Sequence, residues 1–353
     1  MRRWYTTGVL PYLTEGMPGI GGTLRAAPED FVVDEEPAYL PSGAGDHVFV
    51  RIEKRGLTTP AAVEAIARAL GVNPRDIGVA GMKDRHAVTR QWLSLPPPLA
   101  PEAALALAIP DVQILEAQRH PHKLRTGHVR ANRFVLRVRG VGPEGLERAQ
   151  AILDRLAAAP GAPNFYGEQR FGRHGDNAER GRAMLRGERM KDRRMARLMM
   201  SALQSELFNA WLAARLADGL YAQAIAGDLM HKRGGGMFDC VDPTVDSPRI
   251  GEIVPTGPMF GDRMRCPAAA SPAAVREDQI LAAAGLTLDA FGAVRAIAEG
   301  TRRDAAIEVG DPRVAWAAPE TLEVAFTLPG GAYATIVLRE IMKVAVDDAP
   351  PVA

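Results

Sequence analysis

Four consecutive residues with charged or reactive side chains, Lys83, Asp84, Arg85 and His86, interrupt a largely apolar stretch of the chain. They lie in the segment GVAGMKDRHAVTRQWLSL at 78–95, between two runs that are typical of β-strands. Basic neighbours favour the ionised form of Asp84, and an anionic carboxylate suits a nucleophile or an electrostatic stabiliser better than a general acid. A solvated, ion-paired turn would have the same local sequence. The four residues therefore predict either a catalytic loop or a surface turn.

Three further motifs place aromatic rings beside charged or amide groups. They are PEDFVVDE at 28–35, ANRFVLRV at 131–138 and NFYGEQRFG at 164–172. A nucleobase is held by rings that stack on it and by an amide, such as that of Asn132, that hydrogen-bonds its edge. Each phenylalanine taken singly is equally well explained as a core residue, whereas the combination favours a nucleoside pocket.

The segment from Ala117 to Pro143 contains no carboxylate, and we call it the basic stripe. A one-signed segment suits a polyphosphate, because each phosphate that it neutralises releases counterions. The alternative is a strand with a basic, solvated side, which is common for charge runs. Its seven cations and three histidines are Arg119, Lys123, Arg125, Arg130, Arg133, Arg137, Arg139, His120, His122 and His128.

The composition is that of a folded globular protein. The 353 residues are 47% hydrophobic and 24% charged, with a net charge of +1, which suits one large or two medium domains. Two cysteines are too few for a disulfide framework or a thiolate metal site. The N-terminal stretch MRRWYTTGVLPYL lacks the long apolar run that a signal peptide needs, and no run approaches the ~20 apolar residues of a membrane helix, so we expect a cytoplasmic protein.

The pattern of apolar residues predicts both sheet and helix. Strands are expected in GTLRAAPEDFVVDEE, HVFVRIEK, IGVAGM, QWLSL, RFVLRVRGV and TLEVAFTL. A helix is expected after an N-cap at Thr59, ending at Gly71, and others in GLERAQAILDRLAA, within Asp192–Ala217 and in AYATIVLREIMKV. The composition changes after Ala157, which indicates a second domain.

Five ordered motifs give the chain a family resemblance. AGMKDRHAVTRQW, PEDFVV, NFYGEQRFG, SALQSELFNAWLAARL and LPGGAYATIVLREI resemble segments of the TruD-type tRNA pseudouridine synthases. The similarity runs from about Gly22 to Lys343, and residues 223–305 match least. Any one motif would be a modest signal, but five in order are specific.

The resemblance implies an α/β (α+β) fold. A catalytic domain with a mixed, mainly antiparallel sheet would comprise residues 1–160 and 308–345, interrupted by an inserted α/β TRUD domain at 161–307, with a disordered tail at 346–353. It implies isomerisation of uridine to pseudouridine at position 13 of tRNA, without a cofactor or metal. The expected partner is tRNA with a single flipped uridine; no protein partner is implied, and we expect a monomer.

The matched motifs also imply roles for individual residues. Asp84 would be the catalytic aspartate, and it could attack C1′, add to C6 or transfer a proton at the sugar. Uridine would be bound by Phe31, Asn132, Tyr333, Lys83, Glu29 and Phe134. Tyr333 stands where family members have phenylalanine, which leaves the role of its hydroxyl open.

Two other interpretations use the same residues. A non-catalytic RNA-binding protein of the same fold would need the basic and aromatic residues only, but Asp84 would then repel phosphates. A metal-dependent hydrolase could use His120, His122 and His128, but no carboxylate lies near them and the surrounding arginines disfavour a cation.

Overall fold

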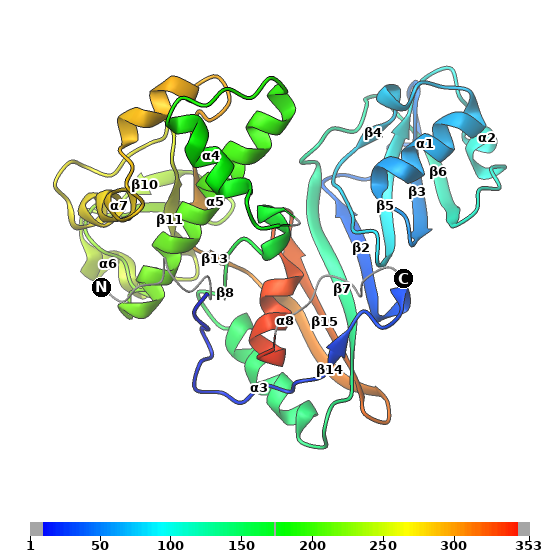
Figure 1. Cartoon of the computed structure of the whole chain (residues 1–353). Coiled ribbons are helices and arrows are strands. Elements are labelled where there is room, and N and C mark those ends of the chain that lie inside the picture. Colours follow the sequence, from blue (N-terminus) through cyan, green and yellow to red (C-terminus); the bar gives the residue numbers. More distant parts are fainter. Residues whose placement is uncertain (1–9, 173, 345–353) are drawn as a thin grey trace. The chain divides into compact units, whose positions relative to one another are not determined.

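The structure, a computed structural model, describes residues 10–172 and 174–344 and divides into two compact units (Figure 1). The large-sheet unit combines Pro18–Asp154, Val309–Ala334 and the residues from Ile341. The α5 unit combines the residues through Met17, Arg155–Glu308 and Thr335–Glu340. The inserted domain predicted at 161–307 stays a prediction, and the predicted tail at 346–353 lies outside the described residues.

The large-sheet unit contains a mixed sheet of nine strands. Seven of them follow the order β14-β15-β7-β2-β5-β3-β6, while β1 pairs with β7 and β4 with β5. Among the described strands only β2 and β5 pair in parallel, which confirms the predicted mixed, mainly antiparallel sheet. The strands are β1 (Thr23–Leu24), β2 (Phe31–Pro37), β3 (His47–Arg55), β4 (Gly78–Val79), β5 (Val88–Leu95), β6 (Val112–His120), β7 (Val129–Arg139), β14 (Gly310–Ala318) and β15 (Thr321–Pro329).

Strand register sorts the side chains of this sheet onto two faces. Phe31 pairs with Leu136, and Glu35 pairs with Asn132, so these four side chains lie on one face, which we call the inner face. The same registers place Lys54 opposite Thr89 on this face. Most inner-face residues are apolar, and the polar ones are therefore exceptions that need a partner or a function.

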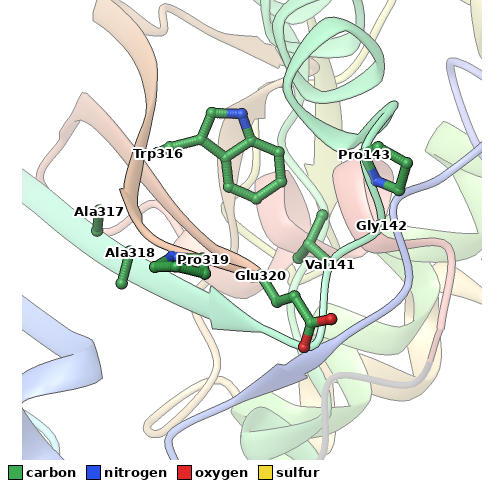
Figure 2. Close-up of a pocket in the computed structure, with 8 residues that line it drawn as sticks. All are labelled: Val141, Gly142, Pro143, Trp316, Ala317, Ala318, Pro319 and Glu320. Atoms are coloured by element: carbon green, nitrogen blue, oxygen red, sulfur yellow. The ribbon is translucent and has the colours of Figure 1, made fainter.

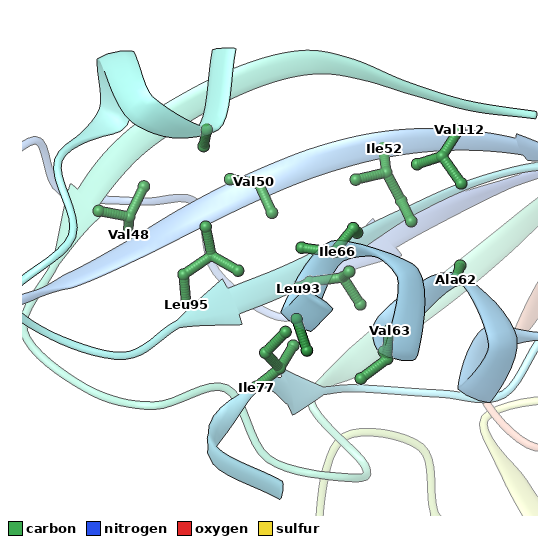
Figure 3. Packing of buried hydrophobic residues seen from close by; sticks show 12 residues of the cluster. Val48, Val50, Ile52, Ala62, Val63, Ile66, Ile77, Leu93, Leu95 and Val112 are labelled. Atoms are coloured by element: carbon green, nitrogen blue, oxygen red, sulfur yellow. The ribbon is translucent and has the colours of Figure 1, made fainter. Parts of the chain in front are cut away.

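Helix α1 (Thr59–Leu70) covers the inner face at β3 and β5 (Figure 3). Its apolar side packs on buried aliphatic residues of both strands. The cluster includes Val48, Val50, Ile52, Ala62, Val63, Ile66, Leu93 and Leu95. The helix ends at Gly71, as predicted, in the left-handed conformation with φ 68°.

The predicted N-cap of α1 is wrong by one residue. Thr58 caps the helix, because its side chain accepts a hydrogen bond from the Ala61 backbone. Thr59 is the first helical residue and is buried. Its hydroxyl is thereby released for contacts with the loop of Asp84.

Other helices of the large-sheet unit are short or lie at its edge. Helix α3 (Gly145–Ala157) begins where Gly145 closely approaches Leu322 of β15, and a side chain on Gly145 would also meet Val141. Helix α2 (Pro101–Leu105) is the short helix of the proline-bounded connector. The strand expected at 77–82 is limited to Gly78–Val79, because a short 3-10 helix precedes it and the loop to β5 begins earlier than expected.

The α5 unit is organised around helix α5 (Arg193–Ala217), which packs on a four-stranded antiparallel sheet of order β10-β9-β11-β12. Gly257 makes this approach possible, since a side chain there would overlap the rings of Trp211 and Phe208. Apolar residues at helical spacing within the predicted helix are mostly core: Met199, Leu203, Phe208, Trp211 and Leu212 are buried, Met195 and Leu216 are half-buried, and Leu198 is exposed. The remaining elements are β8 (Ala162–Pro163), α4 (Asn177–Leu185), β9 (Leu229–Lys232), β10 (Met237–Asp239), α6 (Pro243–Asp246), β11 (Ile253–Met259), α7 (Pro272–Ala283), β12 (Thr301–Asp304), β13 (Ala306–Ile307) and α8 (Ala334–Met342).

None of the helices in the described ranges is both long enough and apolar enough to cross a bilayer.

Candidate active site

Asp84 lies on the loop between β4 and β5, and an arginine that sequence analysis missed contacts it. Nη2 of Arg25 lies 3.3 Å from Oδ2 of Asp84, and the Asp84 side chain is 49% exposed whereas that of Arg25 is 4% exposed. The Arg25 guanidinium also stacks 4.3 Å from the centre of the Phe31 ring. One arginine thus joins the candidate catalytic carboxylate to a candidate pocket residue.

The backbone of Arg25 has an uncommon conformation. Its φ is +62°, in the left-handed region, which residues other than glycine rarely adopt and which costs about 1 to 3 kcal/mol. Strain of this kind persists where the surrounding structure requires it, commonly at functional sites. The positive φ is consistent with selection for the position of the guanidinium over Phe31 and beside Asp84.

A buried lysine on the inner face holds the backbone of Asp84 by a hydrogen bond. Nζ of Lys54 donates hydrogen bonds to the carbonyl oxygens of Asp84 (2.8 Å) and Leu57 (2.5 Å). Lys54 is fully buried on the inner face. Burial lowers its pKa to about 8; the nearby Asp84 opposes this shift and Lys83 adds to it. Burial of the charged Lys54 ammonium group is costly, and its two hydrogen bonds to backbone carbonyls offset part of that cost.

Thr59 and Gln91 hold the same loop at two more points. The Lys83 backbone N–H donates to Oγ1 of Thr59 at 2.9 Å, and that hydroxyl donates to Oε1 of Gln91 at 2.9 Å. Nε2 of Gln91 in turn donates to the Gly81 carbonyl at 3.4 Å. Both polar side chains are buried, so the start of α1 and the strand β5 jointly set the path of the loop.

The Lys83 side chain has a different partner from the one that local sequence suggests. Its ammonium group forms a buried ion pair with Glu35, whose other oxygen accepts a hydrogen bond from the Trp92 backbone at 3.2 Å. Lys83 is therefore matched by Glu35 on the inner face, and Arg25 is the cation that contacts the Asp84 carboxylate. Arg85 points elsewhere, since its Nε donates to the Gly56 carbonyl.

The aromatic and amide residues of the candidate pocket share the inner face. The rings of Phe31 and Phe134 meet edge to face with centroids 6.3 Å apart, and Phe134 also contacts Phe326 at 5.5 Å. Asn132 lies two residues before Phe134 on β7 and is 9% exposed. The structure thus brings Phe31, Phe134 and Asn132 together with the Arg25–Asp84 pair.

Two buried oxygens on this face have no hydrogen-bond partner among the described residues: Oδ1 of Asn132 and Oγ1 of Thr89. Leaving a buried polar atom unsatisfied costs about 1 to 3 kcal/mol, so each such atom needs an explanation. A ligand with a hydrogen-bond donor on its edge would satisfy Oδ1 of Asn132. The base of a uridine carries such a donor, the N3–H group.

The remaining predicted residues lie at the margins of this face. Tyr333 is half-buried in the turn between β15 and α8, and Gly330 in the same turn donates a backbone hydrogen bond to Arg130, near Asn132. Glu29 is exposed and pairs with Arg55 at 2.8 Å. The structure therefore does not bring Glu29 into the aromatic group, and its predicted contact with substrate stays a prediction.

Three of the seven cations of the basic stripe lie on the other face of the sheet. Arg133, Arg137 and Arg139 alternate with Asn132, Phe134 and Leu136 along β7, so they point away from the inner face. Carboxylates also neutralise three cations of the stripe. The ion pairs are Arg130 with Glu36, Arg137 with Glu323 and Arg139 with the buried Asp30.

The histidines of the stripe pack against aromatic rings. His120 stacks on Tyr39 at 5.2 Å and lies 4.3 Å from Phe49, and the Tyr39 hydroxyl lies 2.7 Å from Nδ1 of His128. Burial lowers the pKa of His120, with smaller contributions from His122 and His47. Within residues 10–172 and 174–344 no group of three or more histidine, cysteine or acidic side chains could hold a metal ion.

A pocket of about 530 Å³ lies elsewhere in the large-sheet unit, between the β14–β15 hairpin and the segment before α3 (Figure 2). Trp316, Val141 and Pro143 are among the apolar residues of its wall. No predicted site residue lines it, and Glu320 is the one charged residue of its wall. The inner face, in contrast, combines a strained arginine with unsatisfied oxygens, and we assign the site there.

Comparison with known proteins shows the family of the chain. The sequence profile of the family "tRNA pseudouridine synthase D (TruD)" matches residues 7–191 and 189–341. A tRNA pseudouridine synthase D from Anaeromyxobacter dehalogenans is 53% identical over 348 residues, which are 95% of this chain and 96% of that protein. One from Thermus thermophilus is 42% identical over 338 residues, covering 95% and 92% of the two chains.

A crystal structure described as a putative tRNA pseudouridine synthase D (TruD) from Methanosarcina mazei has the same fold. Its TM-score is 0.79 at 23% sequence identity, covering 96% of this chain and 97% of that one. The resemblance drawn from the five motifs is confirmed by the family profile and by relatives of similar length. The chain belongs to the tRNA pseudouridine synthase D (TruD) family.

Proposed function

We propose that this protein isomerises a uridine of tRNA to pseudouridine, at position 13, with Asp84 as its catalytic anion. Family membership supports the reaction and the substrate. The contact of Arg25 with both Asp84 and the Phe31 ring is the observation that carries the choice of residue. It joins an anion to a stacking surface, which is the pairing that this reaction needs.

The reaction exchanges one bond for another within a single nucleotide. The C1′–N1 bond breaks, a C1′–C5 bond forms, the hydrogen of C5 is released as a proton, and N1 gains a proton. Atoms and electrons balance without a co-reactant. Asp84 supplies the anion for any of three routes: attack on C1′, addition to C6, or proton transfer at the sugar.

The inner face would retain the uracil while it is detached from the sugar. Phe31 and Phe134 offer apolar and stacking surface, and Oδ1 of Asn132 would accept a hydrogen bond from N3–H of the base. The uridine must first leave its stack, which costs a few kcal/mol that stacking and edge bonds in the pocket offset. A single flipped uridine is thus the proposed bound state.

The test uses a tRNA transcript that carries tritium at C5 of its uridines. Formation of the C1′–C5 bond releases the label to water, while the mass of an unlabelled transcript stays the same. We expect release that is lost when uridine 13 is replaced by cytidine. A protein that binds this tRNA tightly yet releases no tritium would be a non-catalytic binder, and the proposal would be wrong.

We also propose that the protein acts as a monomer in the cytoplasm. The two cysteines are unpaired in the structure, with Cys240 buried and Cys266 exposed, which suits a reducing compartment. Light scattering at the concentrations used for activity tests the first point. A dimer that persists on dilution would contradict it.

A further inference from the structure

The α5 unit carries a concentrated set of exposed cations that the proposed site does not use. They surround the start of α5 in the segment RMKDRRMAR at 189–197, which has one carboxylate, that of Asp192. We call these side chains the α5 basic patch. Its members are Arg189, Lys191, Arg193, Arg194 and Arg197, and all five are exposed.

The patch differs from many other arginines of the same unit in having no acidic partner. None of its five side chains forms an ion pair or a hydrogen bond with the part of the chain that the structure describes. Exposed Arg180 and Arg295 of this unit also have no acidic partner among the described residues, but they are isolated, whereas several other arginines are matched with carboxylates at short distance. Examples are Arg215 with Asp228, Arg302 with Glu277, Arg249 with Asp246, Arg265 with Asp239 and Arg276 with Asp218.

These cations do not help the helix to form. Arg193, Arg194 and Arg197 lie in the first turns of α5, where the helix dipole is positive and cations are unfavourable. Arg193 and Arg197 are also one turn apart, which adds like-charge repulsion. Asp192 offsets part of this by accepting hydrogen bonds from the backbone of Arg194 and Met195. An uncompensated basic cluster at this end of a helix points to an external anion.

The face of α5 opposite the patch packs into the core of its unit. Ala196, Met199 and Met200 are buried, so the helix presents its arginines outward from a packed face. Helix α4 crosses α5 closely, because Gly181 allows its backbone to reach Met199 and Leu203. The patch is therefore a surface of fixed shape at the arginine positions of α5.

We propose that the α5 basic patch binds the phosphate backbone of tRNA, as a second contact separate from the uridine pocket. The inference rests on tRNA being the substrate. Four of its five cations are arginines, whose planar guanidinium groups bind phosphate oxygens in pairs. A membrane surface fits less well, because no large apolar side chain is exposed within residues 189–197 and Leu198 is the one exposed directly after them.

The experiment compares two triple variants in the full-length protein. The test variant is Arg193→Gln, Arg194→Gln and Arg197→Gln, since glutamine keeps the helix propensity. The matched control is Arg249→Gln, Arg263→Gln and Arg265→Gln, which removes the same charge from the same unit at arginines that have acidic partners. Thermal unfolding establishes that both variants are folded.

We expect the test variant to bind a tRNA transcript about 10- to 100-fold more weakly at low salt, with a log–log salt slope reduced by about 0.7 to 0.9 for each phosphate that it no longer neutralises. The rate of tritium release at saturating tRNA should stay at the wild-type value, because none of the three arginines belongs to the candidate uridine pocket. The control variant should stay within about twofold of wild-type affinity.

Three results would overturn the inference. An unchanged affinity and slope in the test variant, with an active wild type, would reject the patch and leave the proposed function intact. Equal losses in both variants would indicate a general effect of charge. A test variant that loses binding to vesicles of anionic lipid, but keeps its tRNA affinity, would make a membrane the partner. Failure of the wild type to bind or isomerise tRNA would instead reject the proposed function.

Discussion

At the residue scale, Asp84 depends on groups that are distant in sequence. Its carboxylate contacts Arg25 and its carbonyl accepts a hydrogen bond from Lys54, while the adjacent Lys83 is engaged with Glu35. The side chain can therefore be replaced without removing the bonds that fix the loop backbone. This separation makes substitutions at position 84 informative about chemistry alone.

Asp84→Asn should abolish tritium release while leaving tRNA affinity nearly unchanged. The anion is lost, but the backbone hydrogen bonds and the aromatic pocket remain. Single-turnover assays and filter binding on one preparation measure both quantities. Isomerisation at a rate near that of the wild type would show that Asp84 has been assigned the wrong role.

Lys54 should impose an alkaline limit on activity. Its pKa is lowered to about 8, so above that pH the ammonium loses its charge and its hydrogen bond to the Asp84 carbonyl weakens. The rate should fall through a midpoint near pH 8, and Lys54→Met should be slower and lack that transition.

Stability should respond to the same titration with the opposite sign. Between about pH 8 and 10.5 the unfolded chain binds the proton that the folded protein has lost, so this lysine makes the free energy of unfolding rise with pH. Melting curves of wild type and Lys54→Met isolate the contribution. A wild-type rate that stays flat well above the folded-state pKa would contradict the role of Lys54.

Tyr333 should act through its ring. Tyr333→Phe should be nearly silent, because stacking needs only an aromatic face. Tyr333→Ala should weaken binding of the flipped uridine by roughly 5- to 150-fold, since stacking on a base is worth about 1 to 3 kcal/mol. If the two variants are equally impaired in single-turnover assays below their melting temperatures, the hydroxyl participates.

At the element scale, the loop from Gly81 to Asp84 is positioned by a helix start and two strands. Thr59 at the beginning of α1, Gln91 in β5 and Lys54 in β3 each contribute hydrogen bonds to it. Strand-like alternation in the sequence predicts that all three elements exist, but not which polar residues on them face the loop.

Thr59→Val should test this positioning without changing the shape of the side chain. The variant loses the hydroxyl that links the Lys83 backbone to Gln91, so we expect a rate at saturating tRNA reduced by about 10-fold with an unchanged affinity. Thr58→Val, which removes the helix cap, is the matched control and should lower stability by about 1 kcal/mol with little effect on the saturating rate. A reversed pattern would mean that Thr59 is only a packing residue.

Sequence reasoning succeeded where the signal is local. The five motifs are short patterns, and the resemblance that rests on them implied the mixed sheet that the structure shows. Asp84 and Phe31 lie within these motifs, and Asn132 and Phe134 lie within ANRFVLRV, so the sequence could name them as candidates. Arg25 has no such signal, because its position depends on a left-handed backbone and a fold that returns it to residue 84. The Lys83–Glu35 pair and the direction of the basic stripe depend on strand register, which appears only when strands that are distant in sequence are paired.

At the scale of the whole molecule, positive and negative charges are nearly equal in number but unevenly distributed. The net charge is +1, and many arginines in both units are matched by carboxylates. Attraction of RNA should therefore arise from local groups of unmatched cations. Both the candidate active site and the sheet that carries it belong to the large-sheet unit. Its two main segments, Pro18–Asp154 and Val309–Ala334, are separated in sequence by Arg155–Glu308 of the α5 unit.

That interrupted sequence has a consequence for synthesis on the ribosome. Strand β7 pairs on one side with β2, which is synthesised before it, and on the other side with β15. Strand β15 begins about 180 residues after β7 ends. At ~5 to 20 residues per second it emerges roughly 10 to 35 s later. Until then the nascent chain presents an open, apolar strand edge bearing Phe134, Leu136 and Val138, a template for aggregation. Chains stalled after residue 308 should therefore bind chaperones and be cleaved within β7, whereas chains stalled after β15 has left the exit tunnel should be protected.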